Sequence, residues 1–118
     1  MDTAKFEEIL EARLLSIKAV LGSKAKEYAI GDRLYNFKRA AEIQRTTPQK
    51  ALAGMLMKHL VSVIDLVEGS ISPTEYMVNE KIGDAINYLI LLEAIFKEPV
   101  VNINCVECGE CSNGVIDG

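Results

Sequence analysis

Two long apolar segments, joined by a short polar connection, constrain the fold of this 118-residue chain more than any other feature. The first segment has Thr47 as an N-cap, Pro48 at the first helical position and Gly69 after the last turn. These signals predict a helix over residues 48–68. A long helix with a broad apolar surface must bury that surface against a neighbour, so the segment predicts a packed structure.

The second apolar segment repeats the same pattern of start and stop signals. Ser72 and Glu75 have the spacing of a capping box, and Pro99 prevents the helix from continuing. The pattern predicts a helix over residues 73–98. Because two long helices with so short a connection pack antiparallel, the sequence predicts an all-α fold: a helical bundle built on a long antiparallel helix hairpin.

Two further helices are predicted upstream of the hairpin. Apolar residues from Phe6 to Leu21 recur at steps of three and four, with Thr3 as a candidate N-cap and Gly22 as a candidate stop. A loop rich in basic residues follows. The next helix is predicted from about residue 32 to residue 45.

The composition changes after Pro99. Residues 100–118 are rich in β-branched residues, Gly, Asn and Cys. The length suits one domain, so the sequence predicts an all-α helical domain over residues 1–99 and a short non-helical tail over residues 100–118. The second hairpin helix is apolar nearly all round, which indicates neighbours from another subunit and predicts a homo-oligomer.

The charge distribution narrows the class of partner. The net charge of −4 argues against binding to extended nucleic acid, which usually requires a basic surface. Residues 24–50, however, include seven basic and three acidic residues, which gives this segment a local charge of +4. Such a patch suits a small anion such as a nucleotide phosphate; the alternative is an ordinary solvated helix face. An acidic N-terminus and the lack of a membrane-length apolar run predict a cytoplasmic protein without membrane contact.

Polar side chains interrupt both hairpin helices at matching intervals. Glu80, Asp84 and Asn87 share one face of the second helix, and Lys58 and Asp65 share a face of the first. If these stripes meet, three carboxylates converge and repel one another, which favours a cation. The sequence therefore predicts a Mg²⁺ site on the three acids, with Lys58 nearby. The alternative is an ion-pair network in which neighbouring Lys and Arg side chains neutralise the acids.

The stretches "KEYAIGDRLYNF", "KH" and "EKIGDAINYLILL" resemble small phage-encoded proteins near the nucleotide-modification-associated domain families. Over roughly residues 24–96 the chain is also distantly similar to MazG-like all-α nucleotide pyrophosphohydrolases. That resemblance implies carboxylates that hold Mg²⁺ over a nucleoside triphosphate. The chain departs from the pattern, because Lys58, His59, Ser62 and Asp65 stand where an EExxE motif is expected.

These observations predict a nucleotide-binding protein, Mg²⁺-dependent if it is an enzyme, in which Asp65, Glu80, Asp84 and Lys58 carry the chemistry. A second set of residues is expected to hold the nucleotide by contacting its phosphates, by stacking on its base or by binding the polar edge of the base. They are Lys24, Lys26, Arg33, Asn36, Lys38, Asn87 and Tyr88. His59 is a candidate general base or a core residue. The alternative function is a non-catalytic phage protein that sequesters a nucleotide signal or binds a host protein.

The tail adds a separate candidate site. Cys105, Cys108 and Cys111 stand at two successive CxxC spacings, which can bring thiolates onto one Zn²⁺ ion. A fourth ligand would come from His59, Asp117, water or another subunit. The alternative is an untied tail with incidental cysteines.

Overall fold

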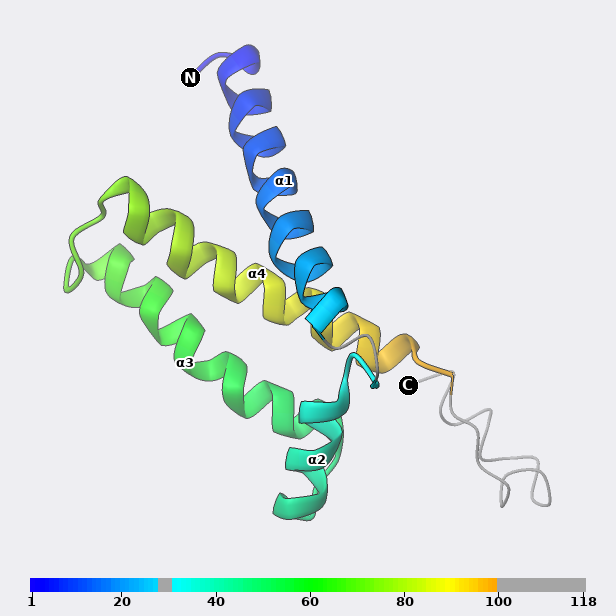
Figure 1. Cartoon of the computed structure of the whole chain (residues 1–118). Helices are drawn as coiled ribbons and strands as arrows, with labels where there is room; N and C mark the ends of the chain where they lie inside the picture. The colour runs from blue at the N-terminus through cyan, green and yellow to red at the C-terminus, as the bar shows by residue number, and fades with distance from the viewer. Residues whose placement is uncertain (28–30, 100–118) are drawn as a thin grey trace.

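The computed structural model describes residues 1–27 and 31–99, which form four helices (Figure 1). They are α1 (Thr3–Glu27), α2 (Tyr35–Gln44), α3 (Pro48–Glu68) and α4 (Glu75–Lys97). The helices α3 and α4 lie side by side and antiparallel, so the predicted all-α fold with a long helix hairpin is confirmed. The predicted cysteine tail lies outside the described residues.

The ends of α3 follow the local signals in the sequence. The Thr47 Oγ1 atom accepts a hydrogen bond from the Lys50 amide at 3.2 Å, and Pro48 occupies the first turn. Gly69 ends the helix with φ 88°, in the left-handed region that favours glycine, and its N–H donates to the Asp65 carbonyl. The predicted range of 48–68 is confirmed.

The start of α4 differs from the prediction. Thr74, not Ser72, is the N-cap: its Oγ1 accepts a hydrogen bond from the Met77 amide at 3.2 Å. Thr74 has the extended backbone conformation of an N-cap immediately before the first helical residue, Glu75. Ser72 instead belongs to the connecting turn, where its carbonyl accepts a hydrogen bond from the Thr74 amide. The predicted capping box at Ser72 is therefore wrong.

Both predicted ends of α1 are also wrong. The helix continues through Gly22 to Glu27, because a single exposed glycine costs a helix only about 1 kcal/mol and does not end it without other signals. At the other end, Asp2 caps the helix in place of Thr3, since its Oδ1 accepts a hydrogen bond from the Lys5 amide at 2.8 Å.

The helix α2 is shorter than the predicted range of 32–45. Asp32 stabilises a turn before it: the Oδ1 atom accepts from the Leu34 amide and the carbonyl accepts from the Tyr35 amide, both at 2.9 Å. Arg45 ends α2 in the left-handed conformation, with φ 56°.

The core lies where α2 meets the α3–α4 hairpin. Leu52 is completely buried, and around it pack Leu34, Phe37, Leu56 and Ile95. Figure 1 shows α1 crossing α4 and its N-terminal half projecting away from the hairpin. No side chain described in α1, over residues 3–22, is buried.

Arg13 of α1 contacts α4 beside a glycine. The Arg13 guanidinium lies against Gly83, where a Cβ atom would be 2.6 Å from Nη1, and its Nη2 donates a hydrogen bond to the Asn79 carbonyl at 3.1 Å. The contact ties α1 to the first half of α4. None of the helices in the described part of the chain combines the length and apolar character needed to cross a membrane.

Candidate functional site

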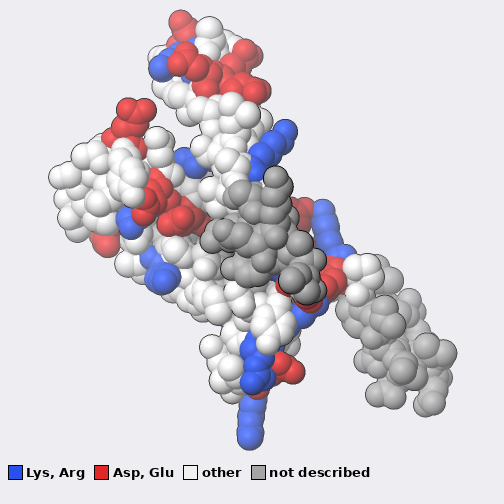
Figure 2. Space-filling view, viewed as in Figure 1, with Lys and Arg blue, Asp and Glu red and all other residues white. Residues whose placement is uncertain are grey.

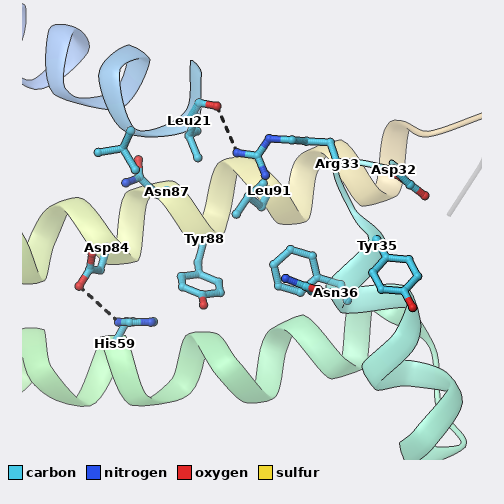
Figure 3. A pocket seen from close by; sticks show the side chains of 12 residues that line it. Leu21, Asp32, Arg33, Tyr35, Asn36, His59, Asp84, Asn87, Tyr88 and Leu91 are labelled. Atoms are coloured by element: carbon cyan, nitrogen blue, oxygen red, sulfur yellow. Dashed lines mark hydrogen bonds and ion pairs between the residues drawn. The ribbon is translucent and has the colours of Figure 1, made fainter. Parts of the chain in front are cut away.

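A cavity of about 330 Å³ lies where all four helices approach one another. This volume is at the lower end of the range of small-molecule sites, roughly 300–1,000 Å³. Figure 3 shows side chains of α4 at its centre, His59 facing them from α3 and the start of α2 at one side. The described residues that line it are Val20, Leu21, Asp32, Arg33, Tyr35, Asn36, Phe37, His59, Asp84, Asn87, Tyr88 and Leu91.

Three rings form the wall between the cavity and the core. His59 stacks on Tyr88 with ring centroids 4.5 Å apart and an interplanar angle of 28°. Phe37 meets the same tyrosine edge to face, at 6.1 Å and 77°. Each ring comes from a different helix, so the contacts hold α2, α3 and α4 in register and keep this wall rigid.

An acid from α4 also lies close to His59. Its Nδ1 atom lies 3.7 Å from the Asp84 Oδ2 atom, within the range of an ion pair when the imidazole is protonated but too long for a hydrogen bond. The His59 side chain is 16% exposed and that of Asp84 is 40% exposed. The acid therefore faces solvent while the imidazole is largely enclosed.

Two polar atoms in the cavity wall are buried without a hydrogen-bond partner among the described residues. They are Nε2 of His59 and Oδ1 of Asn87. A buried polar atom left unpaired costs about 1–3 kcal/mol, so such atoms normally pair with water or a ligand. His59 and Asn87 both line the cavity, so the fold leaves hydrogen-bonding capacity unused in two side chains of its wall.

The side of the cavity near α2 carries the guanidinium of Arg33, next to the carboxylate of Asp32. Arg33 lines it, and its Nη2 donates a hydrogen bond to the Leu21 carbonyl at 3.2 Å, which links the C-terminal half of α1 to the start of α2. A guanidinium has five N–H donors and suits phosphate or carboxylate groups. In Figure 2 several basic side chains lie over α2, whereas acidic ones gather over the N-terminal end of α1 and near the start of α4.

Lys38 is held by two carboxylates beside this rim. Its Nζ pairs with Asp32 and lies 2.6 Å from the Glu98 Oε2 atom. The hydrogen bond from Lys38, together with that from the Leu34 amide, lowers the pKa of Asp32 below its usual 3.8. The same carboxylates, Asp32 first, raise the pKa of Lys38 above 10.5. The ion pairs join the start of α2 to the end of α4.

Several of the predicted nucleotide-binding residues come together in this cavity. Arg33, Asn36, Asn87 and Tyr88 line it, and so does Asp84. Lys38 is not among the described lining residues. The side chains of Lys24 and Lys26 lie outside the described part of the structure.

Two of the three predicted acids lie together, and Asp65 lies apart from them. Glu80 lines a second groove with Asp84, about 260 Å³ in volume, between α1 and α4. The hydrogen bond between Tyr76 and Glu80 raises the pKa of the tyrosine above 10.0. Asp65 and Lys58 line neither space. Among the described residues, no three His, Cys, Asp or Glu side chains are placed to hold a metal ion, so the Mg²⁺ site stays a prediction.

Sequence reasoning did not foresee the parts of the cavity that come from distant elements. Val20 and Leu21 form a wall because α1 crosses α4, and apolar periodicity carries no information on where a helix crosses another. The proximity of His59 to Asp84 depends on the register of the hairpin, which the length of the connection suggests but does not determine.

Comparison of the chain with protein-family models, with characterised proteins and with solved structures found no match. The resemblance to phage proteins and to MazG-like enzymes therefore stays a prediction.

Proposed function

We propose that this protein binds a nucleotide, or a ligand of the same chemistry with a planar heterocycle and a phosphate, in the cavity between the four helices. The observation that carries the proposal is the pair of buried, unpartnered atoms on His59 and Asn87 in the wall of a ligand-sized cavity. Both groups can form hydrogen bonds with the polar edge of a heterocycle.

The rest of the lining fits the same ligand. Val20, Leu21 and Leu91 supply apolar surface for the faces of a planar ring. Arg33 and Asn36 at the α2 side supply donors for a phosphate. A cavity of this volume suits a mononucleotide better than a polymer, in keeping with the acidic net charge of the chain.

Calorimetric titration with mononucleotides and nucleoside triphosphates tests this function. We expect saturable binding of at least one nucleotide. Asn87→Ala should weaken it about tenfold or more, because the variant leaves a ligand group unpaired. Asn79→Ala is the matched control, since this exposed asparagine lies on the same helix outside the cavity and interacts with Arg13 through its backbone. The absence of binding across the panel would overturn the proposal.

Pyrophosphate release measures hydrolysis separately from binding. If the protein is a Mg²⁺-dependent pyrophosphohydrolase, pyrophosphate is released from a triphosphate, EDTA stops the release, and Asp84→Asn reduces it. If the protein only sequesters a nucleotide, binding persists in EDTA and no pyrophosphate appears. Circular dichroism of each variant separates these effects from loss of folding.

A further inference from the structure

The face of the α3–α4 hairpin opposite the cavity is apolar and exposed. Its large side chains are between 37% and 77% exposed. They are Met57, Leu60, Ile64 and Val67 on α3 and Leu89 and Phe96 on α4. We call these six residues the outer face.

Helix geometry places the outer face away from the cavity. At 100° per residue, Met57 and Ile64 lie about 140–160° around the α3 axis from His59. By the same rule, Leu89 and Phe96 lie about 160–180° around α4 from Asn87. The cavity is covered by residues of α1 and of the start of α2, and the outer face is left without a neighbour among the described helices.

The spacing of these residues is that of a helix-pairing seam. Met57, Leu60, Ile64 and Val67 follow one another at steps of three, four and three, the a/d pattern of coiled coils. Leu89 and Phe96 are seven residues apart, and Ile82 continues this series toward the start of α4. A surface helix that faces only water has no need of such a pattern.

The size of the outer face suits association with another helix pair. Two adjacent helices of about 30 Å length and 10 Å width present roughly 600 Å² of projected surface, close to the ~800 Å² that each partner buries in a standard interface. Apolar patches of this extent on a monomer usually mark an interaction site.

The charges at the two ends of the hairpin indicate which partner fits. Glu68 and Glu75 lie at the end with the connecting turn, and Lys50 and Lys97 lie at the other end, where Lys97 also pairs with Glu93. A second copy rotated by a two-fold axis can bring Lys50 and Lys97 of one hairpin near Glu68 and Glu75 of the other. The face is therefore complementary to itself.

We propose that two copies of this chain pair through the outer face, with antiparallel hairpins, to form a four-helix bundle. The two cavities lie on opposite outer sides of the dimer and stay accessible. The proposal does not depend on the identity of the ligand or on nucleotide binding.

The mass of the full chain in solution, measured by light scattering under reducing conditions, tests the proposal. We expect 26 kDa, twice the chain mass of 13.0 kDa. Ile64→Glu should weaken the dimer at least about 100-fold, because a buried unpaired carboxylate is strongly disfavoured. Leu15→Glu is the matched control: Leu15 is 67% exposed but lies on α1, so this variant should stay dimeric.

A cross-linking experiment on the wild-type chain tests the antiparallel arrangement without any variant. A mixture of ¹⁴N- and ¹⁵N-labelled copies is treated with a carbodiimide, which joins a carboxylate directly to an amine. We expect mixed-isotope links between Lys50 and Glu68, or between Lys97 and Glu75. A dimeric mass without these links would overturn the antiparallel arrangement.

Three other outcomes would also overturn the proposal. They are a wild-type mass of 13.0 kDa at 100 µM protein, an Ile64→Glu variant that stays dimeric, and a Leu15→Glu variant that becomes monomeric. If a monomeric wild type co-sediments with lipid vesicles, the outer face is a membrane-binding surface instead.

Discussion

The α3–α4 hairpin and α1 both carry apolar residues at helical spacing, but they use them differently. In the hairpin, Leu52 is fully buried, and Leu56 and Ile95 are nearly so. In α1, Leu10 and Leu14 stay 46% and 42% exposed, and the polar Arg13 donates a hydrogen bond to the backbone of α4. Periodicity thus identifies a helix without showing whether its apolar stripe enters the core.

The largest expected effect comes from deleting core volume in the hairpin. Leu52→Ala should lower the free energy of unfolding by about 2–5 kcal/mol, because it removes buried methyl groups and leaves a cavity. Leu10→Ala on α1 should change it by less than about 0.5 kcal/mol. Urea unfolding followed by circular dichroism measures both, and equal effects would show that α1 belongs to the same cooperative core.

A smaller effect is expected from the helix caps. Thr47→Ala should lower the free energy of unfolding by about 1 kcal/mol, since the first turn of α3 loses its capping oxygen. Asp2→Ala removes the corresponding cap of α1, but α1 contributes little to the core. We therefore expect Asp2→Ala to speed hydrogen exchange in the first turns of α1 only.

The effect of Asp2→Ala on the free energy of unfolding depends on how strongly the folding of α1 is coupled to that of the hairpin. The two substitutions delete hydrogen bonds of the same type, so a difference between them reports on the coupling of each helix to the rest of the molecule. If Asp2→Ala lowered the unfolding free energy as much as Thr47→Ala, the contrast between the two regions would be wrong.

Local signals made the hairpin predictable. Thr47, Pro48 and Gly69 act through their own backbone and nearest neighbours, so the sequence alone is sufficient to place α3. The start of α4 was ambiguous because Ser72 and Thr74 are both good caps, and only the backbone conformation selects Thr74. Gly22 was misleading because glycine ends a helix only when the chain also turns there.

The candidate site was predictable only where its residues share a face of one helix. Asn87 and Tyr88 lie in the cavity as expected from their helix face. The predicted meeting of Asp65 with Asp84 depended on the register between two helices. His59 faces Asp84, and Asp65 is six residues further along α3, about 9 Å at 1.5 Å per residue. The walls made by α1 and α2 depend on long-range packing, which spacing along the chain does not encode.

The smallest expected effect concerns the ion pairs that join the start of α2 to the end of α4 beside the apolar core. Lys38→Met keeps most of the aliphatic stem and removes the ion pairs with Asp32 and Glu98. All three side chains are roughly one-third exposed, so the loss at pH 7 should be only about 0.5 kcal/mol.

The pH dependence of the difference in unfolding free energy between the wild type and Lys38→Met tests whether that difference is electrostatic. The pKa of Asp32 is lower in the folded chain than its usual 3.8, so its contribution is present above pH 3.8 and is lost as the pH falls through the folded value. The difference in unfolding free energy between the wild type and Lys38→Met should therefore shrink as the pH falls below 3.8. Lys5→Met removes the more exposed pair with Glu8 and should have no measurable effect above or below that pH. A Lys38→Met effect that persists at low pH would mean that the lysine stem, and not its charge, holds the junction, and that α2 is attached to the hairpin by packing alone.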